Sequence, residues 1–275
     1  MMAAAIVIGG TLVVTGQHVW GMWITIVLVG LVATYVSYEI HSKLRVHVSE
    51  QVSELQNHVK LTTISATVDN LAMNGIQARF PGIQMPVSTW SMMPSNLQAV
   101  LDYLDRHKPG LVVELGSGIS TLVTAAWFRE RGQGRVFSFD HDPTWADMCR
   151  FYLEQHGLGD WANVRDAPLT DHTVPGERLP WYGLGEQLDD LHDIGLLVVD
   201  GPPAGSRELQ LSRMPALPRF HERLAPTAAV FVDDGEREGE SAIVRQWQEQ
   251  FPEFNARYFA TTTGLWMLTR EKSGA

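Results

Sequence analysis

Five apolar runs of this sequence end on or beside a carboxylate. The acids are Glu114, Asp140, Asp166, Asp200 and the pair Asp233-Asp234. Polar residues begin at the end of any strand, which explains one or two such acids but explains five less well. Carboxylate oxygens bind ligand hydroxyls, positively charged groups and metal ions. If the runs are parallel strands, their carboxyl ends meet at one edge of a sheet, which is where open α/β sheets bind ligands.

Two glycines follow the first of these acids. Gly116 and Gly118 flank Ser117, and Thr121 follows shortly afterwards. Glycine allows the backbone to approach a ligand closely. A dinucleotide-binding fingerprint, G-x-G-x-x-G, needs a third glycine where this sequence has Thr121. An acid just before the loop does not suit a pyrophosphate, but it suits a ligand with positive charge, such as an ammonium or a sulfonium.

Three of the acids are candidate ligands for a shared cation. Asp200, Asp233 and Asp234 end two successive runs, and carboxylates that meet there repel one another unless a cation joins them. Oxygen-only ligands suit Mg²⁺, which would hold a substrate hydroxyl in its deprotonated form. The alternative is that Asp233 and Asp234 only cap their strand, and that Asp200 acts alone as a general base.

Strands and helices alternate around these acids. The apolar runs predict strands over 111–115, 135–140, 162–166, 195–200 and 228–234, with helices over 95–107, 119–131, 143–157, 207–224 and 239–250. Residues 255–261 and 264–270 predict a closing hairpin. The fold class is therefore α/β: a Rossmann-like, doubly wound, mostly parallel seven-stranded sheet with a C-terminal antiparallel hairpin.

The motifs at the strand ends resemble a known family. ELGSG, FDHDP, VRDAPL and VVDGPP are similar, in this order, to the motifs of class I S-adenosylmethionine (SAM)-dependent methyltransferases. ELGSGISTLV, FDHDPTWA, PWYGL, SRMPALP and FVDDGERE more specifically resemble the bacterial methyltransferase type 24 subfamily. Each motif alone is weak evidence, whereas the ordered set, over roughly residues 90–270, is specific. The resemblance implies SAM as the cofactor.

The resemblance also implies residue roles. Asp140 would bind the ribose hydroxyls, Asp166 would receive the adenine amino group, and Asp200 would lie near the transferred methyl group as the catalytic residue. Asp200, Asp233 and Asp234 resemble the Asp, Asp, Asn metal site of catechol-type O-methyltransferases, with Asp234 in place of Asn, so Mg²⁺ is a possible second cofactor. The implied cofactor-binding residues are Glu114, Gly116, Ser117, Gly118, Thr121, Asp140, His141, Asp166 and Ala167.

Four further residues are candidates for contacting the methyl acceptor. Trp181 and Tyr182 would line its pocket, although packing in the core accounts equally well for them. Arg207 and Arg213 follow the Gly-Pro-Pro loop and would bind an anionic substrate, or else pair with Glu208 or Glu222 on a helix surface.

The first 38 residues differ from the rest because they contain no Asp, Glu, Lys or Arg. Residues 19–38 would form a helix of ~30 Å, about the thickness of a bilayer core. We therefore expect a transmembrane anchor over 1–38, single-pass or paired as a short hairpin with residues 2–17; a signal peptide is the rival interpretation. Lys43 and Arg45 follow it, so the positive-inside rule places the catalytic domain in the cytoplasm.

Residues 39–79 predict an amphipathic stalk helix, because apolar residues from Ile40 to Val59 recur at spacings of three and four. This stripe would lie on the membrane or the domain, or form a homodimer. Residues 80–94, rich in Pro and Gly, predict a linker or lid before a methyltransferase domain over 95–275.

The composition narrows the possible partners. A net charge of −10 argues against nucleic acid, and a single cysteine, Cys149, excludes an intrachain disulfide. The sequence predicts a membrane-anchored O-methyltransferase acting on a small-molecule, lipid or glycan acceptor. The alternatives are a nicotinamide-dependent oxidoreductase and an inactive, membrane-tethered scaffold that binds SAM.

Overall fold

The computed structural model describes residues 18–86, 88–174 and 177–270. The chain divides into two compact units, one up to Ile64 and the other from Ser65 onward. Residues 1–17, which contain the first part of the predicted anchor and the possible hairpin partner, lie outside the described residues.

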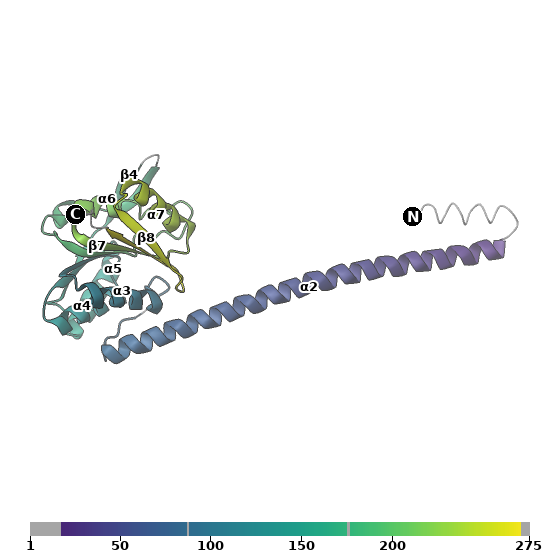
Figure 1. The fold of residues 1–275 in the computed structure, drawn as a ribbon, viewed down its shortest axis with the longest axis horizontal. Coiled ribbons are helices and arrows are strands. Elements are labelled where there is room, and N and C mark those ends of the chain that lie inside the picture. The colour runs from purple at the N-terminus through teal and green to yellow at the C-terminus, as the bar shows by residue number, and fades with distance from the viewer. Residues whose placement is uncertain (1–17, 87, 175–176, 271–275) are drawn as a thin grey trace. The chain divides into compact units, whose positions relative to one another are not determined.

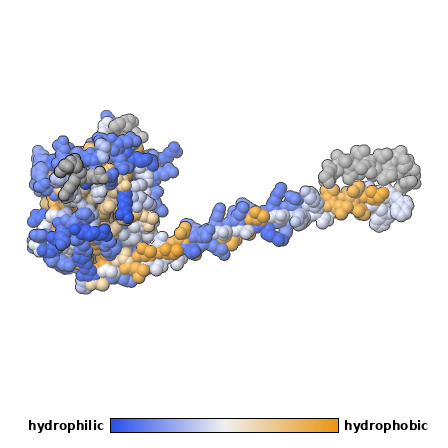
Figure 2. Space-filling model, in the orientation of Figure 1, coloured by the Kyte–Doolittle hydropathy of each residue, from blue (hydrophilic) through white to orange (hydrophobic). Residues whose placement is uncertain are grey.

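Helix α2 (His18–Arg79) contains both the predicted membrane segment and the predicted stalk without interruption. It ends just before Pro81 and Gly82, residues that commonly follow a helix. Among the described residues, α2 is the helix that is long and apolar enough to cross a membrane: an 18-residue window has a mean hydropathy of 1.7 and is 6% buried. Figure 2 shows apolar side chains gathered on its N-terminal part.

The unit from Ser65 onward is built on a seven-stranded sheet (Figure 1). Its strand order is β3-β2-β1-β6-β7-β9-β8. The first five strands are parallel, and β9 and β8 form the antiparallel hairpin at the edge. The bounds are β1 (Leu111–Leu115), β2 (Arg135–Asp140), β3 (Ala162–Asp166), β6 (Ile194–Val199), β7 (Leu224–Asp233), β8 (Phe254–Phe259) and β9 (Leu265–Arg270). The predicted fold is confirmed.

Alternating side chains of the central strands feed two cores, one on each face of the sheet. In β1, Val113 and Leu115 enter one core and Val112 enters the other, as the two-residue period of a strand requires. Helices α3 (Pro94–His107), α4 (Ile119–Arg131) and α5 (Pro143–Gln155) cover one face, and α6 (Ala216–Phe220) and α7 (Glu238–Gln250) the other (Figure 1). The sheet is therefore buried on both sides.

Two segments differ from the sequence prediction. The prediction of a helix over 207–224 was wrong: turns occupy 207–215, and only the short α6 and a 3-10 turn, His221–Arg223, are helical. Pro215 explains the break, because proline lacks the N–H that an interior helical residue donates. The hairpin of β4 (Leu169–Val174) and β5 (Glu177–Tyr182), followed by a 3-10 turn at Gly185–Leu188, was not predicted.

Candidate active site

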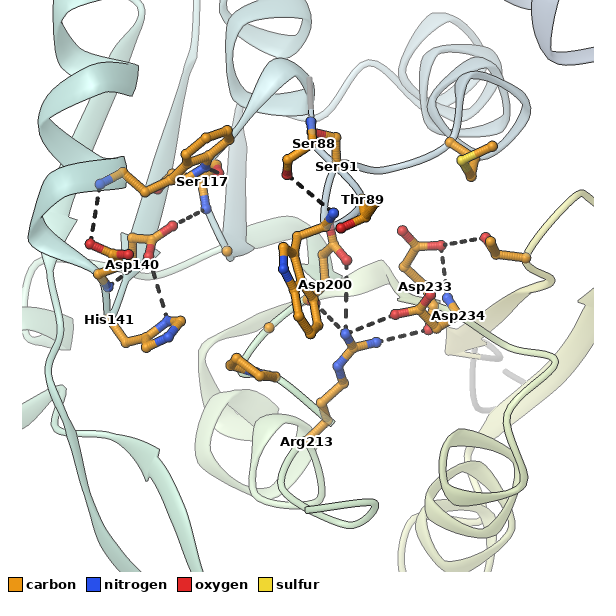
Figure 3. Close-up of a pocket in the computed structure, with 18 of the residues that line it drawn as sticks. Ser88, Thr89, Ser91, Ser117, Asp140, His141, Asp200, Arg213, Asp233 and Asp234 are labelled. Atoms are coloured by element: carbon orange, nitrogen blue, oxygen red, sulfur yellow. Dashed lines mark hydrogen bonds and ion pairs between the residues drawn. The ribbon is translucent and has the colours of Figure 1, made fainter. Parts of the chain in front are cut away.

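A pocket of about 330 Å³ lies at the carboxyl ends of the central strands, within the size range of small-molecule sites. The chain order reverses between β1 and β6, so these neighbouring strands mark the topological switch point of the sheet. We call the residues that follow β1 and β2 the β1–β2 side of the pocket, and those that follow β6 and β7 the β6–β7 side. Figure 3 shows both sides.

Asp140 is the central residue of the β1–β2 side. Its Oδ2 accepts a hydrogen bond from the backbone N–H of Ser117 at 2.7 Å, and its Oδ1 accepts one from Asp142 N–H at 2.9 Å. His141 lies beside it, with Nδ1 at 3.5 Å from Oδ1. Burial raises the pKa of Asp140, and the two backbone N–H donors oppose that rise. Asp140 is thus held rigidly while it lines the pocket.

The glycine loop between β1 and α4 is held from both ends. Gly116 has a φ of 98°, a conformation that favours glycine, and its N–H donates to Phe139 O at 2.8 Å. The indole Nε1 of Trp145, near the start of α5, donates to Ser117 O at 2.5 Å. The loop backbone is therefore fixed at the edge of the pocket.

Glu114 lies beneath this loop. It is 2% exposed and does not line the pocket. Thr121 Oγ1 donates to its carboxylate and accepts the Gly118 N–H at 3.0 Å. Burial raises the pKa of Glu114 to about 7. Glu114, Gly118 and Thr121 thus support the loop from below.

Arg213 is the central residue of the β6–β7 side, where it lies between Asp200, at the end of β6, and Asp233-Asp234, at the end of β7 (Figure 3). It forms ion pairs with Asp234 at 3.0 Å and Asp200 at 3.9 Å. Burial lowers the pKa of the Arg213 guanidinium, but the surrounding carboxylates raise it by more. The net effect is a raised pKa. Burial and the neighbouring Asp233 raise the pKa of Asp200 well above its usual value.

Asp233 is held by the elements around it. Its Oδ1 accepts hydrogen bonds from Asn96 Nδ2, near the start of α3, and from the Asp234 N–H at 2.7 Å. Asp234 has a φ of 59°, a left-handed conformation that Asp and Asn tolerate better than other non-glycine residues. In the described part of the chain, no three His, Cys, Asp or Glu side chains are arranged to hold a metal ion.

The pocket gathers part of the set of site residues predicted from the sequence. Those that line it are Gly116, Ser117, Asp140, His141, Tyr182, Asp200, Arg213, Asp233 and Asp234. Asp166 instead pairs with Arg150 at 3.0 Å. Ala167 and Trp181 are buried in the core. Arg207 is exposed on the turn before Arg213 and does not line the pocket.

Several pocket residues come from segments that carried no motif. Ser88, Thr89, Trp90, Ser91 and Met93 belong to the predicted linker or lid, whose individual residues the sequence did not single out. Asp142, Trp145, Gly201, Pro203, Arg237 and Thr263 also line the pocket. All of these except Thr263 stand within quoted motifs, but no spacing rule assigns them to a ligand. Thr263 reaches the pocket only because β9 pairs with β7.

Comparisons with known proteins agree with this geometry. Residues 113–235 match the family model for the type 24 methyltransferase domain. The SAH-bound methyltransferase PaMTH1 of Podospora anserina has a TM-score of 0.52 at 11% identity, covering 74% of this chain and 88% of its own. The methyltransferase domain of METTL16 has a TM-score of 0.51 at 14% identity, covering 76% and 97%. No curated protein matched the sequence.

The fold is that of class I SAM-dependent methyltransferases, and the pocket lies at the switch point of its sheet. Within that class, the segment from β1 to the loop after β7 matches the type 24 methyltransferase family. The resemblance carried by the strand-end motifs is confirmed.

Proposed function

We propose that this protein is a membrane-anchored, SAM-dependent methyltransferase that methylates an oxygen atom of a small-molecule, lipid or glycan acceptor. The observation that carries the proposal is Asp140. It is 4% exposed, it is fixed by two backbone N–H donors, and it lines a pocket at the switch point of a methyltransferase fold.

The residues of the β1–β2 side fit the cofactor. SAM supplies an electrophilic methyl group on a sulfonium. Asp140 uses one lone pair of each carboxylate oxygen on the backbone, which leaves acceptor capacity for the two ribose hydroxyls. Gly116 and Ser117 bring backbone rather than side chains to the pocket edge, and His141 stands beside Asp140.

The residues of the β6–β7 side fit an acceptor. Asp200 lines the pocket beside the glycine loop, since its N–H donates to Leu115 O at 3.0 Å, and its carboxylate is the candidate that takes the acceptor proton. Tyr182 also lines the pocket, and its hydroxyl is buried without a hydrogen-bond partner among the described residues. A ligand hydroxyl would satisfy it.

Trp90 of the lid segment places an aromatic ring at the pocket. Trp90 lines the pocket and is 66% exposed. Its indole lies over the loop after β6, because a Cβ placed on Gly205 would meet it at 4.0 Å. An exposed indole at a pocket mouth binds rings or hydrocarbon at little entropic cost, which suits a sterically large, partly apolar acceptor.

Calorimetry with SAM tests the cofactor assignment. Asp140→Ala should weaken SAM binding by roughly 1.5–3 kcal/mol, the scale of a hydrogen bond to a charged group. Asp171→Ala, an exposed acid of β4, is the matched control and should bind SAM like the unmodified chain. Equal affinity of both variants would remove Asp140 from the cofactor site.

Methyl transfer itself is tested with SAM that carries a labelled methyl group. The full chain is incubated with membrane and soluble extract fractions, and labelled products are separated by charge and polarity. A labelled ether or ester that requires the intact chain supports the proposal. SAM binding without any labelled product would instead support the inactive scaffold.

The membrane arrangement rests on α2. Residues 19–38 carry no charge, and Lys43 and Arg45 follow them. We place the catalytic unit in the cytoplasm on this basis. The test fuses, after the last residue, a reporter that is active only in the cytoplasm. We expect this reporter to be active, and an inactive reporter would overturn the orientation.

The homodimer through the stalk stays a prediction. The apolar stripe of the stalk is exposed on α2, with Ile40 at 61% and Leu55 at 63%. Crosslinking of cysteine variants along this stripe, in membranes, would distinguish pairing with a second copy from contact with lipid.

A further inference from the structure

Arg213 is a buried cation that joins the loops after β6 and β7. Its side chain belongs to the turns before α6, and the residue is 2% exposed. Nε donates to the carbonyl oxygen of Pro202 at 3.3 Å, and Nη1 donates to the carbonyl oxygen of Asp233 at 3.0 Å. Nη2 donates to the carbonyl oxygen of Asp200. One guanidinium thus binds the ends of both β6 and β7, on the β6–β7 side of the pocket.

The remaining donors of Arg213 face carboxylates. Nη2 lies 3.0 Å from Asp234 Oδ2, and Nη1 lies 3.3 Å from Oε1 of Glu240, a residue of α7 with no exposed surface. The three carbonyl oxygens and Asp234 accept hydrogen bonds from the guanidinium, and Glu240 adds an ion pair, so each of its three nitrogens is engaged. This arrangement favours a role in holding the acceptor side together over direct binding of an anionic substrate.

A divalent metal would compete with N–H groups and guanidinium groups for two of the carboxylate oxygens, one of Asp233 and one of Asp234. Mg²⁺ binds oxygen at about 2.0–2.1 Å in a near-octahedral shell. Asp234 Oδ2 is shared by Arg213 and by Arg237, whose Nη1 is 2.7 Å away. Asp233 Oδ1 accepts from Asn96 and from the Asp234 N–H. Arg213 pairs with Asp200 and Asp234, and no three acidic side chains in the described part of the chain are arranged to hold a metal ion. These residues therefore do not fit the metal site that Asp200, Asp233 and Asp234 predicted.

We infer that Arg213 takes the place of the divalent cation, so that the acceptor side of this enzyme is organised without a metal. The guanidinium supplies positive charge to the four neighbouring carboxylates, Asp200, Asp233, Asp234 and Glu240. Its planar array of donors holds Asp200 by its carbonyl oxygen and Asp234 by its carboxylate. Arg213 is then a positioning residue that acts through Asp200. The acceptor role rests on the proposed function, whereas the exclusion of a metal depends only on these residues.

The first test measures metal binding directly on the full chain in detergent. Mn²⁺ alone is the probe, read by electron paramagnetic resonance, and the unfolding temperature is recorded with millimolar Mg²⁺ and with EDTA. We expect no stoichiometric Mn²⁺ and the same unfolding temperature in both conditions. One tightly bound Mn²⁺ per chain that Asp200→Asn abolishes would overturn the inference.

The second test asks whether removing the guanidinium creates a metal site. Arg213→Met leaves the carboxylates without their buried partner, so the variant should gain Mn²⁺ binding and a Mg²⁺-dependent rise in unfolding temperature. Adding Asp200→Ala, which removes one of the three carboxylates, should abolish that gain. Arg219→Met, an exposed arginine on α6, is the matched control and should behave like the unmodified chain. A purely structural role for Arg213 predicts loss of stability in Arg213→Met without any response to the metal.

If Arg213→Met does not fold, Arg213→Lys replaces it, because an ammonium keeps the charge but cannot reach the two loops at once. Arg213→Lys should bind Mn²⁺ measurably more tightly than the unmodified chain. If no folded variant of Arg213 binds Mn²⁺, the inference is wrong. SAM calorimetry on the same samples separates the two proposals. Failure to bind SAM refutes the proposed function, whereas metal binding by the unmodified chain refutes only the role of Arg213.

Discussion

Glu114 should make the stability of the folded protein depend on pH near neutrality. The carboxyl group lies in β1 beneath the glycine loop, with 2% of its surface exposed. Burial raises its pKa from 4.5 to about 7. The folded state therefore binds the proton more tightly than the unfolded state, and the stability gained from this is present below about pH 4.5 and lost as the pH rises through about 7.

Glu114→Gln removes this dependence while keeping the shape of the side chain. The difference between the two pKa values corresponds to roughly 3 kcal/mol at most, at about 1.4 kcal/mol per tenfold change in proton affinity. The glutamine carbonyl still accepts the hydrogen bond from Thr121. The variant should therefore match the unmodified chain at acid pH and be more stable at alkaline pH.

Urea unfolding of the full chain in detergent, followed by tryptophan fluorescence at about pH 5 and about pH 8, measures the effect. Glu154→Gln is the control, because Glu154 is an exposed glutamate of α5. If Glu114→Gln and Glu154→Gln show the same pH dependence as the unmodified chain, Glu114 is not protonated by burial and the reasoning fails.

Two further changes probe the packing around the pocket. A Cβ at Gly201 would lie 2.0 Å from the Tyr182 hydroxyl oxygen, so Gly201→Ala should cost about 1–3 kcal/mol of stability. Adding Tyr182→Phe should restore most of this stability. If the double variant is not more stable than Gly201→Ala, the clash lies elsewhere. The Asp69 carboxylate accepts hydrogen bonds from the Ser95 N–H at 2.9 Å and from Thr262 Oγ1 at 2.5 Å. Asp69→Ala should therefore lower the free energy of unfolding by about 1–3 kcal/mol in a denaturant titration. An unchanged unfolding midpoint would refute this prediction.

The sequence identified pocket residues where an acid marks the end of a central strand of the sheet. A strand buried on both faces must be apolar throughout, so its first acid marks its end. Asp140, Asp200 and Asp233 are recognisable for this reason, and each lines the pocket. Asp166 obeys the same pattern but pairs with Arg150, because its strand is at the edge of the sheet and α5 brings an arginine within 3.0 Å.

The segments that could not be predicted depend on partners distant in sequence. The β4–β5 hairpin is polar on one face, and only the alternation of buried Leu179 and Trp181 with Arg178 and Pro180 marks it. The turns that carry Arg213 contain apolar residues at helical spacing, and only Pro215 and Pro218 indicate that no long helix forms. The burial of Arg213 between two strand ends follows from tertiary packing, which a single sequence does not encode locally.

The last turns of α2 are structurally part of the catalytic unit. Asp69 binds the N–H of Ser95 at the start of α3, and the next residue, Asn96, donates to Asp233 in the pocket. Asp69 also binds Thr262, whose neighbour Thr263 lines the same pocket. Two adjacent pairs of residues thus connect α2 to the β6–β7 side of the pocket. A chain shortened to begin at Ser65 keeps these contacts, whereas one shortened beyond Asp69 loses them. The structure therefore ties the orientation of Asp233 to the helix that also carries the apolar segment.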